Sequence, residues 1–395
     1  MGGGSTNVVI TASANSNTNA RSCIVQIAGQ DFYVSQAGAE VSLSKVSLSI
    51  DGSFYGLFSS KSNPEIFGSF SLKKAKAGVT GKIRVESRLL PFSTKLDSSG
   101  HANVNIQRRG KSTLTLLFNL SNDGNQLEGT ISDGVWDADL LANRAVFNSR
   151  TNPAPYAGKY TIAIVGPSEG PTSPGGIGFA TVNVLLNGMV LAKGTLGDGR
   201  NFSHSTMLSQ TGMWPFCAGI YNGGGGIGGW LYFDLKNTQN IPSGELTWTK
   251  PAALNVGSGF SNNVVVIGSS FHSPDTATNS LLGYSNGTLT FMGGDLDIGV
   301  AKDVIITLPL NRIESASKDE NKLTSSIKKK EGSFTGSMQI PPYLNVVKFK
   351  GCILQNRDIG CGFFVGTNAN GRVILQSVPS LKANAESDIT EGLVH

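Results

Sequence analysis

Two-residue turn signals recur along the chain and separate short apolar segments. Dipeptides of Asp or Asn followed by Gly supply the positive φ angles that tight hairpin turns require. The segments between them, such as Ser112 to Leu120 and Gly371 to Val378, show the period-two or continuous apolar patterns of strands. The chain is therefore predicted to be all-β, with consecutive antiparallel hairpins. The signals are Asp51-Gly52, Asp123-Gly124, Asp133-Gly134, Asn187-Gly188, Asp198-Gly199 and Asn286-Gly287.

The composition agrees with this prediction. Glycine accounts for 50 of the 395 residues and only 15% are charged, which is typical of short strands joined by many turns. No segment of a dozen residues has a capped 3.6-residue apolar period, although residues 137–147 fit either a short helical turn or a strand. A chain of this length is expected to form several domains.

An internal repeat defines the units. SLKKAKAGVTGKI at Ser71 to Ile83 aligns without a gap with the last 13 residues of SSIKKKEGSFTGSM (Ser325 to Met338), so that Leu72 falls on Ile327, and a weaker third copy surrounds Gly194. In each copy a strand glycine is followed by a strand that contains phenylalanine. The glycines are Gly81, Gly194 and Gly336, and the phenylalanines are Phe92, Phe202 and Phe349.

Units of this size with seven or eight strands form either up-and-down barrels or sandwiches, and the strand glycines favour repeated small barrels. The predicted division is residues 1–40 for a partial immunoglobulin-like module or terminal strands, 41–151, 152–255 and 256–380 for three barrel-like units, and 381–395 for a tail. The third unit is expected either to stand alone or to pack with the second as one domain.

The two lysine tracts within the repeat are interpreted as scaffold. The second copy has Asn187-Gly188 where the others have lysines, so the lysines are expected at a hairpin tip that points into water. The alternative is a site for an anionic ligand. The net charge of +5 is small for this length, and nucleic-acid binding is not expected.

The segment ARSCIVQIAGQDFYVSQAG (Ala20 to Gly38) has a small-residue-Arg-Ser start, a Gly turn, and a strand that ends in Ser-Gln-Ala-Gly. It resembles the last hairpin of bacterial immunoglobulin-like modules of the BACON type, with Cys23 where that family usually has a small residue. A sandwich cannot close with two strands, so the resemblance implies the C-terminal fragment of a large secreted or surface protein. The remainder resembles uncharacterised β-rich regions that follow such modules, which are associated with carbohydrate-active and mucin-binding proteins.

Localisation is expected to be secreted or at the cell surface, because the composition is poor in charge and rich in Asn, Thr and Gly. The N-terminal MGGGSTNVV lacks the basic start and apolar core of a signal peptide, so a native targeting segment is expected to be absent from this sequence. No apolar run is long enough for a transmembrane helix.

Carboxylates are the candidates for catalysis. Asp133, Asp137 and Asp139 surround a tryptophan, and Asp295 and Asp297 lie in GGDLDIG. Residues two apart on a strand share a face at roughly 7 Å, which suits a glycoside-cleaving pair separated by about 5 to 10 Å. The alternatives are ordinary exposed hairpins and weak calcium ligation. His101, His204, His272 and His395 show no ligand spacing, so neither a metal site nor a cofactor is predicted.

Cysteine and tryptophan supply the remaining candidates. If Asn356 and Arg357 form a turn, Cys352 faces Cys361, either as a cross-strand disulfide or as two buried thiols. Trp214 and Trp230 flank the run NGGGGIGG, which is interpreted as a rim loop, and are the candidates for an exposed platform that binds sugar. Trp136 and Trp248 occupy corresponding repeat positions and are expected in cores.

These observations favour a non-enzymatic surface module for adhesion, glycan binding or spacing. A glycan-cleaving hydrolase and a carrier of a small ligand inside a barrel are the alternatives. The expected partner is a polysaccharide or another surface protein. Strand-mediated self-association is a further expectation, because an incomplete sheet leaves edges unpaired.

Overall fold

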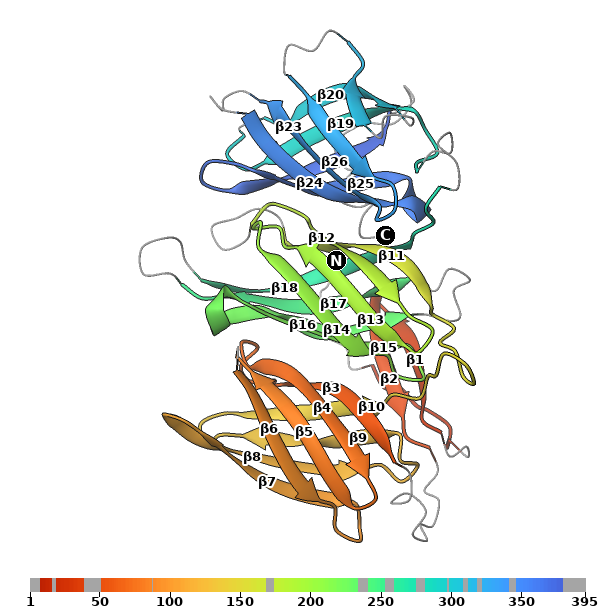
Figure 1. Cartoon of the computed structure of the whole chain (residues 1–395), viewed down its shortest axis with the longest axis vertical. Coiled ribbons are helices and arrows are strands. Elements are labelled where there is room, and N and C mark those ends of the chain that lie inside the picture. The colour runs from red at the N-terminus through yellow and green to blue at the C-terminus, as the bar shows by residue number, and fades with distance from the viewer. Residues whose placement is uncertain are drawn as a thin grey trace.

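The computed structural model describes residues 8–15, 19–38, 51–86, 88–167, 174–233, 241–252, 259–274, 281–296, 298–307, 312–317, 322–340 and 346–378. These residues form one two-stranded sheet and three antiparallel sheets of eight strands, each curled into a nearly closed barrel. Figure 1 shows the three barrels side by side along the long axis of the molecule. The predicted all-β class with repeated barrel-like units is confirmed. None of the described residues forms a helix with the length and apolarity needed to cross a membrane.

The first barrel has an up-and-down order in which its first and last strands, β3 and β10, pair and close the sheet. Consecutive strands pair with each other except β6 and β7, and this interruption gives the strand order β6-β5-β4-β3-β10-β9-β8-β7. The strands are β3 (Gly52–Ser59), β4 (Phe67–Ala75), β5 (Gly78–Val85), β6 (Arg88–Lys95), β7 (His101–Arg108), β8 (Lys111–Leu120), β9 (Gln126–Ser132) and β10 (Asp137–Arg144).

The second barrel repeats this plan, with β11 paired to β18 and the interruption between β14 and β15. Its last strand lies beyond residue 255, so the boundary predicted there falls inside this barrel. The strands are β11 (Gly158–Val165), β12 (Gly178–Val184), β13 (Met189–Thr195), β14 (Asn201–Met207), β15 (Met213–Ile220), β16 (Gly225–Phe233), β17 (Pro242–Lys250) and β18 (Phe260–Ser270).

The third barrel closes through β19 and β26, but its interruption comes one strand earlier, between β21 and β22. The first two barrels divide four and four around this point, whereas the third divides three and five. The strands are β19 (Asn286–Gly293), β20 (Val300–Thr307), β21 (Arg312–Ser315), β22 (Thr324–Lys328), β23 (Ser333–Gln339), β24 (Val346–Leu354), β25 (Ile359–Val365) and β26 (Asn370–Ser377).

The repeat has a structural basis in every barrel. Gly81 pairs with Phe92, Gly194 with Phe202, and Gly336 with Phe349. A Cβ built on Gly336 would lie 2.2 Å from Cζ of Phe349, and one on Gly81 would lie 2.3 Å from Cζ of Phe92. The inward ring therefore covers the glycine of the neighbouring strand, which lets a large side chain fit inside a narrow barrel.

The barrel interiors are filled by side chains. Each barrel has its own cluster of buried apolar residues, which includes Phe54, Phe70 and Phe118 in the first barrel and Trp214 and Phe216 in the second. A third cluster centres on Phe291, Phe334 and Phe349. Eight-stranded barrels are just wide enough to be filled in this way. This packing argues against an internal site for a small ligand.

The second and third barrels meet through a fourth apolar cluster, which joins β11, β12 and β18 to β24, β25 and β26. Phe179 and Phe363 pack with ring centroids 6.3 Å apart, and Oγ1 of the buried Thr161 donates a hydrogen bond to the Ile353 carbonyl at 2.6 Å. The first and second barrels meet where β15 faces β3 and β4. As a result, β11 and β15 are buried on both faces.

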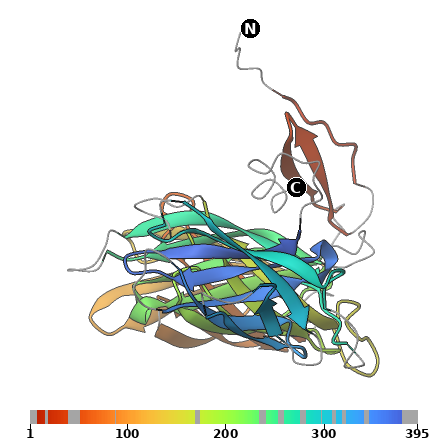
Figure 2. The ribbon, with the colours of Figure 1, turned by 90° about the horizontal axis from the view of Figure 1, so that it is seen from above.

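The two-stranded sheet consists of β1 (Arg21–Ile27) and β2 (Gln30–Gln36). Figure 2 shows this hairpin projecting from the side of the stack. Tyr33 of this hairpin stacks on Tyr232 of the second barrel, with ring centroids 6.1 Å apart. Phe32 is 46% exposed and lies opposite Val25, so an apolar face remains open among the described residues. The immunoglobulin-like resemblance and self-association stay predictions.

Candidate functional site

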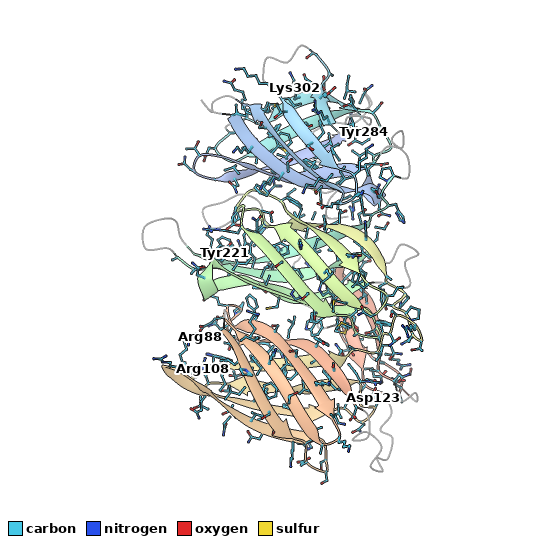
Figure 3. The ribbon with its side chains drawn as sticks, in the orientation of Figure 1. Arg88, Arg108, Asp123, Tyr221, Tyr284 and Lys302 are labelled. Atoms are coloured by element: carbon cyan, nitrogen blue, oxygen red, sulfur yellow. The ribbon has the colours of Figure 1, made fainter. Side chains whose placement is uncertain are left out.

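The first group of carboxylates does not share one environment, because Asp133 lies in a turn whereas Asp137 and Asp139 lie on one face of β10. Asp133 forms an ion pair with Arg108 at 2.8 Å, and both side chains are largely buried. Burial raises the pKa of Asp133, but hydrogen bonds from Arg108 and from the N–H groups of Val135 and Trp136 outweigh that effect and lower it. Figure 3 shows Arg108 on the first barrel. Asp133 therefore fixes a turn and is unsuited to donate a proton as a catalytic acid at neutral pH.

Asp137 and Asp139 are exposed on the outer face of β10, and Asp139 pairs with Lys61 at 2.7 Å. The residues predicted as a short helical turn or strand form this strand. Asp295 has a φ of 68°, and its Oδ2 accepts the N–H group of Asn368 at 2.8 Å. Asp297 lies outside the described residues. Among the described residues, no group of three or more acidic, His or Cys side chains is arranged to hold a metal ion.

The structure places the tryptophans differently from the prediction. Trp214 is fully buried in the second barrel, where its ring packs on Phe216 at 5.4 Å, so its predicted exposure is wrong. It lies on the inward face of β15, which the alternation alone did not identify. Trp230 is half-buried on β16 opposite Pro215 and stays a candidate. The predicted rim loop is mostly strand, because β16 begins at Gly225.

Trp248 is buried, as predicted, and its polar edge is satisfied at the end of the second barrel. Its Nε1 donates to the Tyr221 hydroxyl at 3.0 Å, and that hydroxyl donates to Asp198 at 2.6 Å. Lys250 pairs with Asp198 at 3.5 Å and lies over the Tyr221 ring. Tyr221 is labelled in Figure 3. The charges of Asp198 and Lys250 compensate each other, and Trp248 and Tyr221 have hydrogen-bond partners within the network. We therefore assign the network a structural role.

The predicted register of Cys352 opposite Cys361 is confirmed. Both residues are thiols with no disulfide, and both are fully buried in the cluster between the second and third barrels. The Cys352 thiol donates to the Ile162 carbonyl at 3.5 Å, and a hydrogen bond with Cys361 together with burial raises its pKa. The pair is therefore part of the joint between the barrels.

The lysine tip of the first copy is only partly solvated. Lys73 is exposed, but Lys74 points into the barrel, has 1% of its side chain exposed, and pairs with Asp51 at 3.6 Å. The prediction that both lysines point into water is wrong for Lys74, because β4 continues to Ala75 and its alternation carries Lys74 to the inner face.

A cleft of about 440 Å³ lies between the first and second barrels, and we call it the Trp136 cleft. Its volume is within the roughly 300 to 1,000 Å³ of typical ligand sites. The first barrel contributes Asn63, Glu65, Ile66, Phe67, Val85, Glu86 and Trp136, and the second contributes Cys217, Gly219, Gly224, Gly225, Gly226 and Thr249.

Trp136 forms an aromatic wall of this cleft together with Phe67. Its half-buried ring stacks on Phe58 at 6.4 Å with an angle of 6° between the planes, so one face is held by the core of the first barrel. It follows β9 in a turn, where Asp133 accepts its N–H group. The expectation that Trp136 lies wholly in the core is therefore corrected.

The glycine-rich wall brings backbone atoms to the cleft surface. A Cβ on Gly226 would lie 2.4 Å from the Ala218 carbonyl oxygen, and one on Gly225 would lie 2.5 Å from that of Thr249. Larger residues would therefore clash with the neighbouring strands. Close approach of backbones is a common reason for glycine inside a strand.

The polar side chains of the cleft are the carboxylates of Glu65 and Glu86, the amide of Asn63 and the hydroxyl of Thr249. Glu65 is exposed, and its N–H group donates to Oδ1 of Asn63 at 3.1 Å. Glu86 pairs with Lys111. Burial raises the pKa of the Cys217 thiol to about 12, so this thiol stays protonated at neutral pH and is not an activated nucleophile.

The chain has little detectable similarity to known proteins. No family model matches the chain, and no curated protein matches it. A solved structure with some likeness is isotype 1 transferrin binding protein B from serogroup B Neisseria meningitidis, with 10% sequence identity and a TM-score of 0.21. The match covers 80% of this chain and 66% of that chain.

Proposed function

We propose that this chain is a non-enzymatic module of a secreted or cell-surface protein that binds neutral glycan in the Trp136 cleft. The observation that carries the proposal is the convergence of the Trp136 ring with Glu65 and Asn63 at the joint between two barrels. The apolar face of a sugar ring stacks on an indole, while carboxylates and amides bind its hydroxyl groups. The low charge of the sequence and its resemblance to modules of surface proteins support the extracellular assignment.

The alternatives have less support. A hydrolase would need a carboxyl group whose pKa is raised so that it can act as an acid, whereas that of the buried Asp133 is lowered. A carrier would need space inside a barrel, and the three interiors are occupied by aromatic and aliphatic side chains. A purely structural spacer would not need the Trp136 cleft.

Retention of the purified chain on a panel of neutral polysaccharides tests the proposal. Retention that persists in high salt is expected, since stacking and neutral hydrogen bonds are screened little. Trp136→Ala is expected to weaken binding roughly tenfold. Glu65→Gln should also weaken binding, and because Glu65 is exposed, this variant keeps the fold.

Trp230→Ala is the matched control, because Trp230 is the half-buried tryptophan that the sequence favoured. Loss of binding in this variant alone would move the site to β16. No retention on any neutral polysaccharide would refute glycan binding in the cleft. Release of reducing ends that Glu65→Gln abolishes would show a hydrolase instead.

A further inference from the structure

A second concave surface lies between the second and third barrels and differs in charge from the first. It is an open groove of about 640 Å³ between the outer faces of β12–β14 and of β22–β24. Three lysines line it, Lys193 from the second barrel and Lys328 and Lys350 from the third. We call it the lysine groove. Neither barrel forms it alone.

Each lysine stands beside hydroxyl groups on the neighbouring strands. Lys193 is paired with Thr181 on β12 and with Ser203 on β14, and all three side chains belong to the groove. In the third barrel Lys350 is paired with Thr335. The same arrangement of an ammonium group beside a hydroxyl group therefore occurs on both walls. Such a surface offers charge to an anion and hydrogen bonds to neighbouring polar groups.

The positive charge is only partly compensated. Glu331 is the one acidic residue of the lining, and it pairs with Lys328 at 3.5 Å. Among the described residues, neither Lys193 nor Lys350 has a salt bridge. Three ammonium groups against one carboxylate leave an excess of two positive charges in the groove.

We propose that the lysine groove binds an acidic polysaccharide, with uronate or sulfate groups on the ammonium groups and sugar hydroxyls on the threonines and serines. An open surface with three separate ammonium groups suits a polymer that carries several anionic groups better than an isolated small anion. Single-stranded nucleic acid is disfavoured, because the aromatic rings of the lining are buried: Phe179 is 7%, Phe202 8% and Phe334 0% exposed. Bases would therefore lack the exposed rings on which they stack.

This inference goes beyond the Trp136 cleft and does not depend on it, since the two sites share no residue. It also revises the interpretation of the second lysine tract, one of whose residues, Lys328, faces the groove.

The test measures binding of the full chain to heparin, polygalacturonate, dextran and polyglutamate. Binding to heparin or polygalacturonate at about 50 mM salt is expected to weaken at least about tenfold near 1 M, where the Debye length falls to about 3 Å. Binding to dextran through the Trp136 cleft would be insensitive to salt. Binding of polyglutamate as tight as that of either acidic polysaccharide would overturn the assignment to a glycan.

The triple variant Lys193→Gln, Lys328→Gln, Lys350→Gln is expected to lose at least about tenfold in affinity for the acidic polysaccharide. The control Lys73→Gln, Lys76→Gln, Lys82→Gln removes the same charge from exposed positions of the first barrel and should stay within about twofold. Equal losses in both variants, or wild-type binding by the groove variant, would overturn the proposal. Trp136→Ala should leave this binding intact.

Discussion

His204 makes the stability of the second barrel depend on pH. Its Nε2 lies 3.0 Å from the Pro215 carbonyl and bridges the interruption between β14 and β15, and its ring packs on Phe216 at 4.9 Å. Burial lowers the pKa of His204 to about 4, although hydrogen bonds with the backbone of Pro215 and Cys217 oppose this, and Arg84 lowers it further. The imidazole is therefore neutral in the folded chain at pH 7 and donates from Nε2.

The size of the effect follows from linkage. Between pH 6.5 and about 4 the unfolded chain binds a proton at His204 that the folded chain does not bind. The free energy of unfolding is thus unaffected by His204 above pH 6.5 and falls as the pH is lowered toward 4. A difference of 2.5 units at 1.36 kcal/mol each gives a loss of at most about 3 kcal/mol.

His204→Gln isolates this contribution, because a glutamine amide can still donate to a carbonyl but cannot titrate. Urea unfolding followed by tryptophan fluorescence between pH 4 and 7 suits the test, since Trp214, Trp230 and Trp248 all lie in the second barrel. The difference in unfolding free energy between wild type and variant should shrink by up to about 3 kcal/mol toward pH 4. Parallel curves would refute the reasoning. His101→Gln, at an exposed histidine, is the control.

Two further predictions concern packing. Gly336→Ala should destabilise the third barrel by about 1 to 3 kcal/mol, because the new Cβ would lie 2.2 Å from Phe349. In a double-mutant cycle, Phe349→Leu should remove part of that cost, and strictly additive effects would contradict the contact. Lys74→Ala should lower the free energy of unfolding of the first barrel by about 2 kcal/mol more than Lys74→Met does. The reason is that methionine fills the buried space of the lysine side chain, which is 1% exposed. Equal effects of the two variants in urea or thermal unfolding would contradict a packing role.

The fold was predictable because its signals are local. Aspartate or asparagine followed by glycine marks turns, and a glycine opposite a phenylalanine marks a narrow barrel. The position of the repeated hairpin within each barrel was not predictable from such local signals. Gly81 and Gly194 lie on the third strand of their barrels, whereas Gly336 lies on the fifth, counted along the chain. The same hairpin therefore occupies a different place in the strand order of the third barrel, and aligning the repeats does not reveal this difference.

The candidate sites were harder to predict because they depend on contacts between barrels. Alternation shows that a strand has two faces, but not which one is inside, so Trp214 was predicted to be exposed although it is buried, and the half-exposed position of Trp136 in a cleft was missed. A usable signal was present in TIAIV on β11 and WPFCA on β15, runs without alternation that are typical of strands buried on both faces. Such strands indicate a second packed layer, here a neighbouring barrel.

Both proposed binding sites lie at joints between barrels, and this position follows from how the barrels are built. A barrel whose interior is filled offers a ligand only its convex outer surface and its hairpin ends. Where two barrels meet, two convex surfaces enclose a concave one, and the Trp136 cleft and the lysine groove both arise at such places. Each site takes side chains from two barrels, so an isolated barrel would carry only half of either site. The buried cluster around Cys352 and Cys361 then has a functional consequence, because fixing the second joint also fixes the spacing of Lys193 and Lys350 across the groove.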